Sequence, residues 1–238
     1  MIDFGSVKSL TIPEGSVKKI TANGVVFWEK VTSRLPSAYQ EVEWIGSTGS
    51  QKINYSQARA TDNEISLKFT IDKYTSMYAC GAFFTSPNRA FLLARLSGSQ
   101  QTFEFYSATQ SYVRATNYKL ALNTVYEMHL KTDFATLKNT FTIAQNGIVG
   151  YTGTSTPDNI TTLLTTFCVC HSGGLVGNEN AGLQGKMYSY QHKSDGVIVR
   201  DFVPCYRKSD GVIGMYDIVS KQFFTNEGSG SFTKGADV

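Results

Sequence analysis

Residues 206–235 read YRKSDGVIGMYDIVSKQFFTNEGSGSFTKG, and this stretch contains the second copy of a repeated hexapeptide. KSDGVI occupies residues 193–198 and recurs at residues 208–213. Each copy stands between segments in which apolar and polar residues alternate, and Asp-Gly readily supplies the positive φ angles of a tight hairpin turn. The sequence therefore predicts two consecutive β-hairpins, and we interpret the repeat as a folding element rather than a ligand-binding motif.

A third hairpin is predicted where GMYD at 214–217 is followed by IVSK and QFFT. The glycine-rich segment EGSGSF comes next, at residues 227–232. Gly228 and Gly230 suit a turn or a bulge. A phosphate-binding loop would need a helix directly after it, and no helical pattern follows here.

Strand and turn patterns continue through most of the chain after residue 40. Turn signals recur about every 8–12 residues, and Asn146-Gly147 is the clearest of them. The predicted fold class is all-β, an antiparallel two-sheet jelly-roll sandwich, with one short helical turn at 131–139. Apolar and polar residues alternate, as they do in a strand that buries one face, in ISLKFTI at 65–71, TFEFY at 102–106, VYEMHL at 125–130 and TFTIA at 140–144.

The N-terminal segment has its own pattern of short strands. SVKSLTI at 6–12 and SVKKITA at 16–22 are near copies, and an Asn-Gly pair precedes VVFWE at 25–29. The polar and proline-containing VTSRLP that follows is typical of a linker. We therefore predict an N-terminal β-hairpin docking module at residues 1–32 and a jelly-roll domain at residues 33–238.

Three short strands cannot hold a stable core alone, so the module either packs on the sandwich or pairs with neighbouring chains. Pairing is favoured, because a small strand-rich arm before a linker can dock onto a particle through its strand edges. Val25, Phe27 and Trp28 are the candidate docking residues.

The composition is that of a folded protein. Of 238 residues, 41% are hydrophobic and 17% charged, which argues against disorder. The net charge of +3 is too small and too dispersed for a nucleic-acid binder. No apolar run reaches the roughly 18 residues of a membrane helix, and MIDFGSVKSL lacks the features of a secretion signal. We expect neither a nucleic-acid nor a membrane partner, and synthesis in a cytosol.

Cys168, Cys170 and His171 raise the question of a metal site. Residues two apart on a strand lie about 6.5–7 Å from each other, which suits one tetrahedral zinc ion poorly. The favoured interpretation is a buried strand with free thiols. No metal and no other cofactor is expected.

Catalytic patterns are weak. Glycoside hydrolysis needs two carboxylates roughly 5–10 Å apart across a groove, and no dense Glu-x-Asp-x-Glu motif occurs. The Gly-x-Ser-x-Gly elbow of serine hydrolases is absent as well, and His129 is interpreted as a surface histidine. The prediction is a protein that is not an enzyme, with a sandwich-fold glycoside hydrolase as the alternative.

Two loops carry side chains that suit a glycan, because aromatic rings stack on sugar faces and Asn, Arg and His bond the hydroxyls. One loop, at 107–114, contains Tyr112 and Arg114. The other, at 171–180, is glycine-rich and polar, as binding loops tend to be. For this second loop, a plain surface loop without a ligand is the stronger interpretation. The candidate ligand-binding residues are Tyr112, Arg114, His171, Asn178 and Asn180.

Two long segments resemble one family of proteins. RLPSAYQEVEWIGSTGSQKI at 34–53 and RDFVPCYRKSDGVIGMYDIVSKQFFTNEGSGSFTKG at 200–235 are similar to phage and prophage structural proteins that carry a concanavalin-A-like, or laminin-G-like, jelly-roll domain. GLQGKMYSYQHKSDGVIVRDF at 182–202 resembles the strand pair near the end of that domain. VKKITANGVVFWEK at 17–30 resembles short modules of such phage proteins. Between residues 62 and 166 the match is one of pattern only.

The resemblance implies a virion component without catalytic activity, such as a tail, baseplate, head-fibre or decoration protein, assembled in the bacterial cytoplasm. Its sandwich would face a host-surface glycan or another virion protein. Other virion proteins are the partners expected at the N-terminal module, and a homo-oligomer is expected. A decoration protein without any ligand is a further alternative. Where the family often has Asp-Thr-Gly after the first strand, this chain has KINYS at 52–56, so the role of that acid does not carry over.

Overall fold

The structure is a computed structural model of the 238-residue chain. It describes residues 19–22, 25–29, 34–58, 60–84, 89–106, 112–157, 164–171 and 181–238; at 19–22, 25–29, 83–84, 89–91 and 164–165 it describes the backbone alone. The chain divides into two compact units, Met1–Arg34 and Leu35–Val238.

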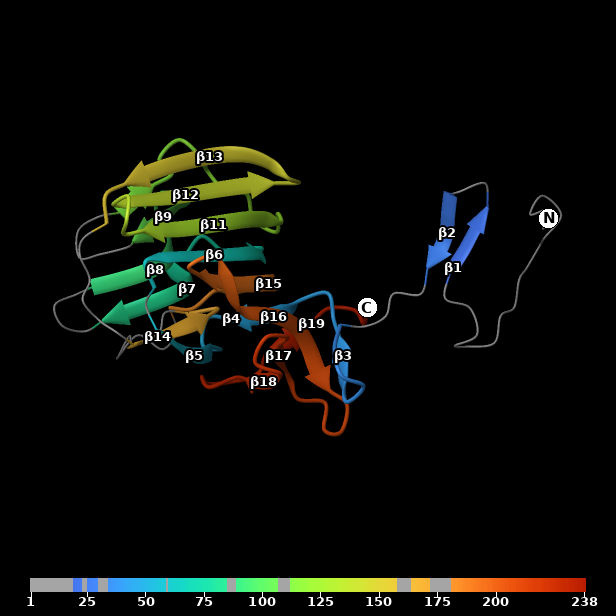
Figure 1. The fold of residues 1–238 in the computed structure, drawn as a ribbon. Coiled ribbons are helices and arrows are strands. Elements are labelled where there is room, and N and C mark those ends of the chain that lie inside the picture. Colours follow the sequence, from blue (N-terminus) through green and yellow to red (C-terminus); the bar gives the residue numbers. More distant parts are fainter. Residues whose placement is uncertain are drawn as a thin grey trace. The chain divides into compact units, whose positions relative to one another are not determined.

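The N-terminal unit contains one antiparallel strand pair. Strands β1 (Lys19–Ala22) and β2 (Val25–Glu29) form a two-stranded ribbon (Figure 1). The strand expected at residues 6–12 and the side chains of Val25, Phe27 and Trp28 lie outside the described part of the chain. The docking role of these three residues stays a prediction.

The smaller sheet of the Leu35–Val238 unit has six strands. Their order across the sheet is β10 (Tyr112–Arg114), β9 (Thr102–Tyr106), β8 (Arg89–Ser97), β7 (Met77–Phe84), β14 (Leu164–Val169) and β5 (Ile53–Ala58). β7 to β10 follow one another along the chain, so this end of the sheet is a meander of hairpins (Figure 1).

The larger sheet contains the C-terminal hairpins. Its main order is β13 (Ile148–Ser155), β12 (Lys138–Gln145), β11 (Tyr126–Asp133), β6 (Asp62–Phe69), β15 (Gln184–Ser194), β16 (Val197–Arg207), β17 (Ile213–Asp217) and β18 (Gln222–Thr225). Three short strands extend it: β3 (Tyr39–Glu41) on β16, β4 (Ile45–Thr48) on β15 and β19 (Thr233–Lys234) on β4.

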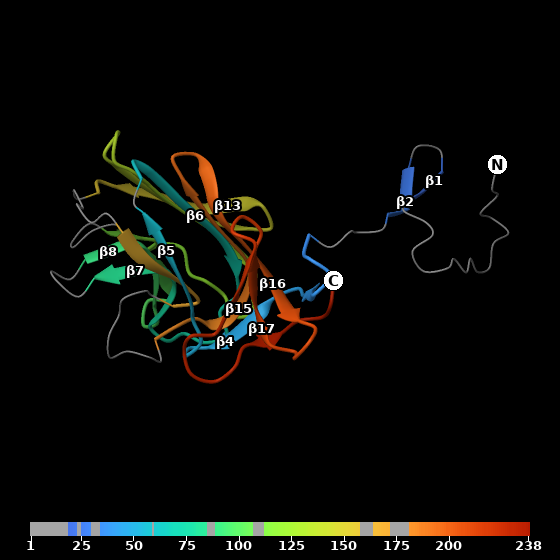
Figure 2. The ribbon, with the colours of Figure 1, turned by 60° about the horizontal axis from the view of Figure 1, so that its bottom comes forward.

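The two sheets pack face to face as a sandwich. Figure 2 separates the layers, with β5, β7 and β8 in one and β6, β15 and β16 in the other. The strands pair antiparallel, and the described residues contain no helix. The predicted all-β, antiparallel two-sheet sandwich is confirmed. Within the same described ranges, no helix has the length and apolar character needed to cross a membrane.

The core lies between the sheets and is rich in aromatic side chains. Alternation along β6 buries Leu67 and Phe69 while their neighbours face outward, as expected of a strand with one covered face. The Phe69 ring of the larger sheet meets Phe103 of the smaller sheet edge to face, at 5.3 Å between centroids. Such pairs add to the stabilisation that burial itself gives. The core thereby joins the sheets directly through ring contacts.

A polar cluster interrupts this apolar core. The Tyr55 hydroxyl lies 2.7 Å from the Tyr190 hydroxyl and 2.9 Å from Nδ1 of His192. His192 is fully buried, and burial together with the positive charge of Arg200 lowers its pKa to about 3. The imidazole is therefore neutral at physiological pH, and the cluster consists of uncharged hydrogen-bonding groups.

Two hairpins have the predicted two-residue turns. Asn146 and Gly147 have φ angles of 52° and 73°, and Asp195 and Gly196 have 49° and 75°. A methyl group placed on Gly196 would touch nothing within 4 Å, so the backbone angle, rather than space, favours glycine there.

The second KSDGVI copy also forms a hairpin, but through a longer loop. The Gly211 N–H donates to the Arg207 carbonyl at 2.8 Å, and the Arg207 N–H donates to the Val212 carbonyl at 2.9 Å. Of its Asp-Gly pair, only Gly211 has a positive φ. The Asp210 carboxylate pairs with Arg207 and accepts the Val212 N–H, which stabilises this wider turn.

The helical turn predicted at 131–139 is wrong. These residues form the end of β11, a turn and the start of β12. Oδ1 of Asp133 accepts the N–H groups of Ala135 and Thr136 at 2.9 and 3.0 Å. This side-chain acceptor satisfies the turn locally, so the hairpin closes without a helix.

Candidate ligand-binding face

The smaller sheet has one face on the core and one face turned away from it. Phe103, Phe105 and Val113 of β9 and β10 belong to the core. Because side chains alternate along a strand, the residues between and beside them project from the opposite face. We call the group on β8, β9 and β10 the Tyr–Arg face, which consists of Arg95, Glu104, Tyr106, Tyr112 and Arg114.

Strand register brings these five residues together. Arg114 of β10 lies opposite Glu104 of β9, and Glu104 lies opposite Arg95 of β8. In the neighbouring row, Tyr112 lies opposite Tyr106. Opposed residues of adjacent strands have Cβ atoms about 4.5–5.5 Å apart, so a row of two arginines and a glutamate runs beside a row of two tyrosines.

Glu104 is the anchor of the Tyr–Arg face. Its side chain is 1% exposed. Nε of Arg114 donates to Oε1 at 2.7 Å, and the Tyr106 hydroxyl donates to Oε2 at 2.6 Å. Nη1 of Arg95 contacts Oε2 at 3.4 Å. A buried carboxylate requires such partners, and its charge-assisted hydrogen bonds in turn hold the donors in fixed positions.

Tyr106 remains protonated in this arrangement. Burial, followed by the hydrogen bond to the Glu104 carboxylate, raises the pKa of Tyr106 to about 12. Its hydroxyl is therefore a hydrogen-bond donor to Glu104 throughout the physiological pH range.

Tyr112 provides an accessible aromatic surface. Its side chain is 45% exposed, and its ring stacks on Tyr106 with 5.3 Å between centroids and 28° between planes. The guanidinium carbon of Arg114 lies 5.3 Å from the centroid of Tyr112. An exposed ring next to guanidinium donors can stack on the apolar face of a sugar and bond its hydroxyl groups.

The structure brings two of the predicted ligand-binding residues together and buries a third. Tyr112 and Arg114, expected on a loop, lie on the same face of strand β10. His171, expected on an open loop, is only 3% exposed, and its ring centroid lies 6.5 Å from that of Tyr78. Asn178 and Asn180 lie outside the described residues.

Sequence reasoning missed Arg95, Glu104 and Tyr106. The alternation in TFEFY at 102–106 places Glu104 and Tyr106 on one strand face, and this signal was available. Their contacts with Arg114 and Arg95 depend on the register of three strands, for which the sequence carries no direct signal.

The four cysteines are buried and form no disulfide bond. Burial raises the pKa of Cys80 to about 12, and it raises the pKa of Cys168 and Cys170 as well. Protonated thiols are poor metal ligands. Within the described ranges, no group of three or more His, Cys, Asp or Glu residues could hold a metal ion.

A serine, a histidine and a glutamate meet on the outward side of the larger sheet. Oγ of Ser66 lies 2.8 Å from Nδ1 of His129, and Oε1 of Glu64 lies 3.6 Å from Nε2. Glu64 also pairs with Lys193 at 3.2 Å. Ser66 is paired in register with β11 and with β15, so neighbouring strands flank it on both sides. Acyl transfer needs free N–H donors beside the nucleophile, and a paired strand surface is a poor source of them.

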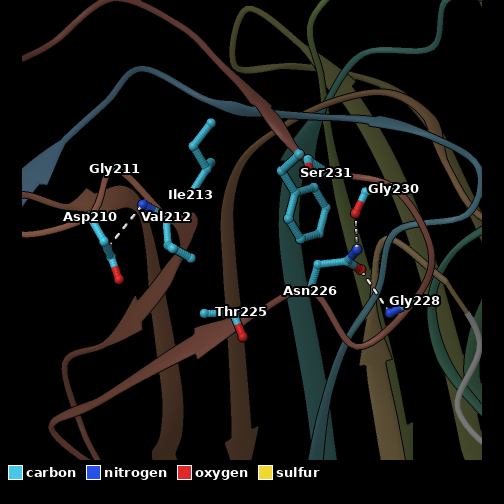
Figure 3. A pocket seen from close by; sticks show the side chains of 10 residues that line it. Asp210, Gly211, Val212, Ile213, Thr225, Asn226, Gly228, Gly230 and Ser231 are labelled. Atoms are coloured by element: carbon cyan, nitrogen blue, oxygen red, sulfur yellow. Dashed lines mark hydrogen bonds between the residues drawn. The ribbon is translucent and has the colours of Figure 1, made fainter.

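A pocket of about 390 Å³ lies where the second KSDGVI copy meets the glycine-rich loop (Figure 3). Two of its polar side chains, Asp210 and Asn226, form hydrogen bonds within the loops themselves. Nδ2 of Asn226 donates to the Gly230 carbonyl, and its Oδ1 accepts the Gly228 N–H, both at 2.8 Å. A methyl group on Gly228 would overlap the Ser50 carbonyl oxygen, so this glycine allows the two backbone segments to pack closely. The pocket has no exposed aromatic ring beside arginine side chains among its lining residues, whereas the Tyr–Arg face has both.

Comparison with known proteins finds related folds among solved structures but no related sequence family. No protein-family model matches the chain, and no curated protein sequence matches it. A putative carbohydrate-binding protein from Bacteroides ovatus is 13% identical with a TM-score of 0.54; the match covers 83% of this chain and 62% of that one, less than two thirds of its length.

Two further matches are weaker. A heptameric SAP-like pentraxin from Limulus polyphemus is 11% identical over 64% of this chain and 76% of that one, with a TM-score of 0.46. A sialidase from Trypanosoma rangeli is 9% identical over 74% of this chain and 33% of that one, with a TM-score of 0.45. At 13% identity, the likeness to the Bacteroides ovatus protein is one of fold alone.

Proposed function

We propose that the Leu35–Val238 unit is a carbohydrate-binding domain without catalytic activity, and that it binds its glycan on the Tyr–Arg face. One observation carries this proposal: the exposed Tyr112 ring, stacked on Tyr106, lies beside an Arg114 side chain that the buried Glu104 holds in place. Ring stacking and planar hydrogen-bond donors are the two interactions that sugars require.

The position of these residues on paired strands strengthens the proposal. Tyr112 and Arg114 are fixed by the register of β10 on β9, and Glu104 fixes the Arg114 guanidinium. Side chains that are ordered before binding lose less conformational entropy when a ligand arrives. A flexible sugar can therefore be bound by a rigid surface.

We further propose that this domain belongs to a phage virion protein of the tail, baseplate, head-fibre or decoration type, assembled in the bacterial cytoplasm as a homo-oligomer. The similarity of residues 34–53 and 200–235 to phage structural proteins supports this origin. The β1–β2 ribbon supports docking onto other virion proteins, because an isolated two-stranded ribbon is marginally stable and gains from pairing with a partner.

The binding proposal is tested with a glycan array and an oligosaccharide hydrolysis assay on the full chain. We expect binding without cleavage, and Tyr112→Ala should weaken binding about tenfold, which corresponds to ~1.4 kcal/mol. Tyr206→Ala, on β16 of the larger sheet, is the matched control and should bind as the wild type does. Cleavage of any oligosaccharide would overturn the non-catalytic role. Failure to bind any glycan would overturn the carbohydrate-binding role and favour a purely structural protein.

A further inference from the structure

We propose that the glycan bound at the Tyr–Arg face is acidic, and that its carboxylate or sulfate group contacts Arg95 and Arg114. This inference rests on the proposed carbohydrate-binding function and names the class of sugar. Three observations support it: the number of charged side chains on the Tyr–Arg face, how deeply each is buried, and the N–H donors of Arg95 and Arg114 that Glu104 does not use.

The Tyr–Arg face carries more positive than negative charge. Glu104 forms ion pairs with Arg95 and with Arg114, so two guanidinium groups share a single carboxylate. Arginine stays charged at every physiological pH. The protonated Tyr106 contributes no charge, so the five residues together are cationic.

The charges are also separated by depth. Glu104 is 1% exposed, whereas the side chains of Arg95 and Arg114 are 37% and 30% exposed. The Glu104 carboxylate therefore lies beneath the surface, whereas the two guanidinium groups extend to the surface. A ligand that approaches from solvent meets positive charge first, and an anionic ligand is attracted.

Both arginines retain donors for a ligand. A guanidinium group has five N–H donors. Arg114 directs its Nε and Nη2 at Oε1 of Glu104, and among the described residues Nη1 has no hydrogen-bond acceptor. Arg95 contacts Glu104 through Nη1, at the long distance of 3.4 Å, and it also hydrogen-bonds to Tyr106; these two contacts do not use all five of its N–H donors. Planar N–H pairs fit carboxylate and sulfate oxygens in a bidentate manner, which a neutral hydroxyl cannot match.

The exposed ion pairs of the larger sheet are arranged differently. Lys131 pairs with Asp62, Lys68 with Glu127, and Lys234 with Asp237, one cation to each carboxylate. Glu64 contacts Lys193 and His129. Among the ion pairs of the described residues, Glu104 is the carboxylate shared by two arginines. The carboxylate shared by two guanidinium groups thus lies on the same surface as the exposed Tyr112 ring.

The experiment uses the full chain on a paired glycan array. Each sugar backbone is printed as the free acid and as its neutral counterpart: uronates beside their methyl esters, sialylated beside asialo chains, and sulfated beside desulfated chains. We expect the acidic member to bind at least about tenfold more tightly, with an advantage that shrinks as NaCl rises from about 0.05 M to about 0.5 M. The kind of sugar pair in which the acidic member binds more tightly identifies the recognised anion as a carboxylate or a sulfate.

Arg95→Gln is the decisive variant, because Arg114 and Tyr106 still pair with Glu104 when Arg95 is replaced. The acidic preference should fall severalfold. Arg95→Lys keeps the charge without the planar donor fork and should retain part of the preference. Lys68→Gln makes the same charge change on β6 of the larger sheet and should leave the preference intact.

The outcomes separate this inference from the proposed function. Equal binding of acidic and neutral members, or a preference that survives Arg95→Gln in a folded protein, overturns the acidic-glycan inference while glycan binding stands. Absence of binding to every printed sugar overturns glycan binding itself, and the inference with it. Thermal unfolding of each variant establishes that it is folded.

Discussion

The Tyr106 hydroxyl donates a 2.6 Å hydrogen bond to Oε2 of Glu104, a carboxylate that is 1% exposed. This bond links the aromatic row of the Tyr–Arg face to its charged row. The pKa of Tyr106 therefore reports whether its hydrogen bond to Glu104 is formed.

Tyr106 should lose its proton at a higher pH than an ordinary tyrosine. Its pKa is raised to about 12, first by burial and then by Glu104, so this group favours the folded state below pH 10 and loses that contribution as the pH rises from 10 to about 12. The difference in phenolate absorbance between the wild type and Tyr106→Phe isolates this residue. In Glu104→Gln the midpoint should move toward 10, and an unchanged midpoint would mean that Glu104 does not influence Tyr106.

Replacing Glu104 by alanine should destabilise the protein. The variant loses charge-assisted hydrogen bonds from Arg114 and Tyr106, and the half-buried arginines lose their shared counter-charge. We expect a loss of about 2 kcal/mol in the free energy of unfolding, measured in urea. Glu127→Ala is the matched control, because its 3.8 Å pair with Lys68 is exposed, and it should cost below about 0.5 kcal/mol. Equal effects of the two substitutions would contradict the anchoring role of Glu104.

His192 should make the fold sensitive to acid. Its pKa of about 3 lies below the value near 6.5 of an unfolded histidine, so the stability it contributes is present above pH 6.5 and is lost as the pH falls toward 3. Between pH 7 and pH 4 this loss should amount to about 3 kcal/mol. Urea unfolding at both pH values, for the wild type and His192→Gln, measures it. A loss of the same size in the variant would assign the acid sensitivity to other groups.

Gly196→Val should weaken folding and leave glycan binding intact. The residue has a φ of 75° in the Asp195-Gly196 turn, a region in which a branched side chain is strained by roughly 1–2 kcal/mol. Val197→Thr, at the next and exposed position, is the control and should have little effect. A folded Gly196→Val protein of full stability that had lost binding would show that the KSDGVI repeat belongs to a ligand site.

Deleting residues 1–32 should separate docking from binding. The Leu35–Val238 unit is compact by itself, so the shortened protein should keep its thermal stability and its glycan affinity. Incorporation into virus particles should be lost. Particles that still contain the shortened protein would disprove the docking role of Val25, Phe27 and Trp28.

The alternation of apolar and polar residues in the sequence was sufficient to predict the fold class. The alternation in ISLKFTI at 65–71 appears directly in the burial of β6, and Asn146-Gly147 forms the turn expected of it. These signals are local, since a strand face and a two-residue turn are each set by a few neighbouring residues. The hairpin turn at 131–139 was mispredicted as helical because the hydrogen bonds that form it come from one side chain, Asp133.

The site was predictable only in part. Tyr112 and Arg114 were found because an aromatic and an arginine in a polar segment suit a sugar. Glu104 was missed because its burial results from side chains on β8 and β10, and strand register decides which residues those are. His171 was expected to be accessible, yet it is 3% exposed, since its burial depends on packing that the glycine-rich segment after it does not reveal.

All five residues of the Tyr–Arg face lie within residues 95–114, on three successive strands at the β10 end of the smaller sheet. The proposed binding surface is therefore a short, continuous segment of the sequence at one edge of the smaller sheet. Under the proposed function, exchanging this segment between related proteins, by recombination or by design, should alter which sugar is bound while the central strands and the C-terminal hairpins keep their sequence.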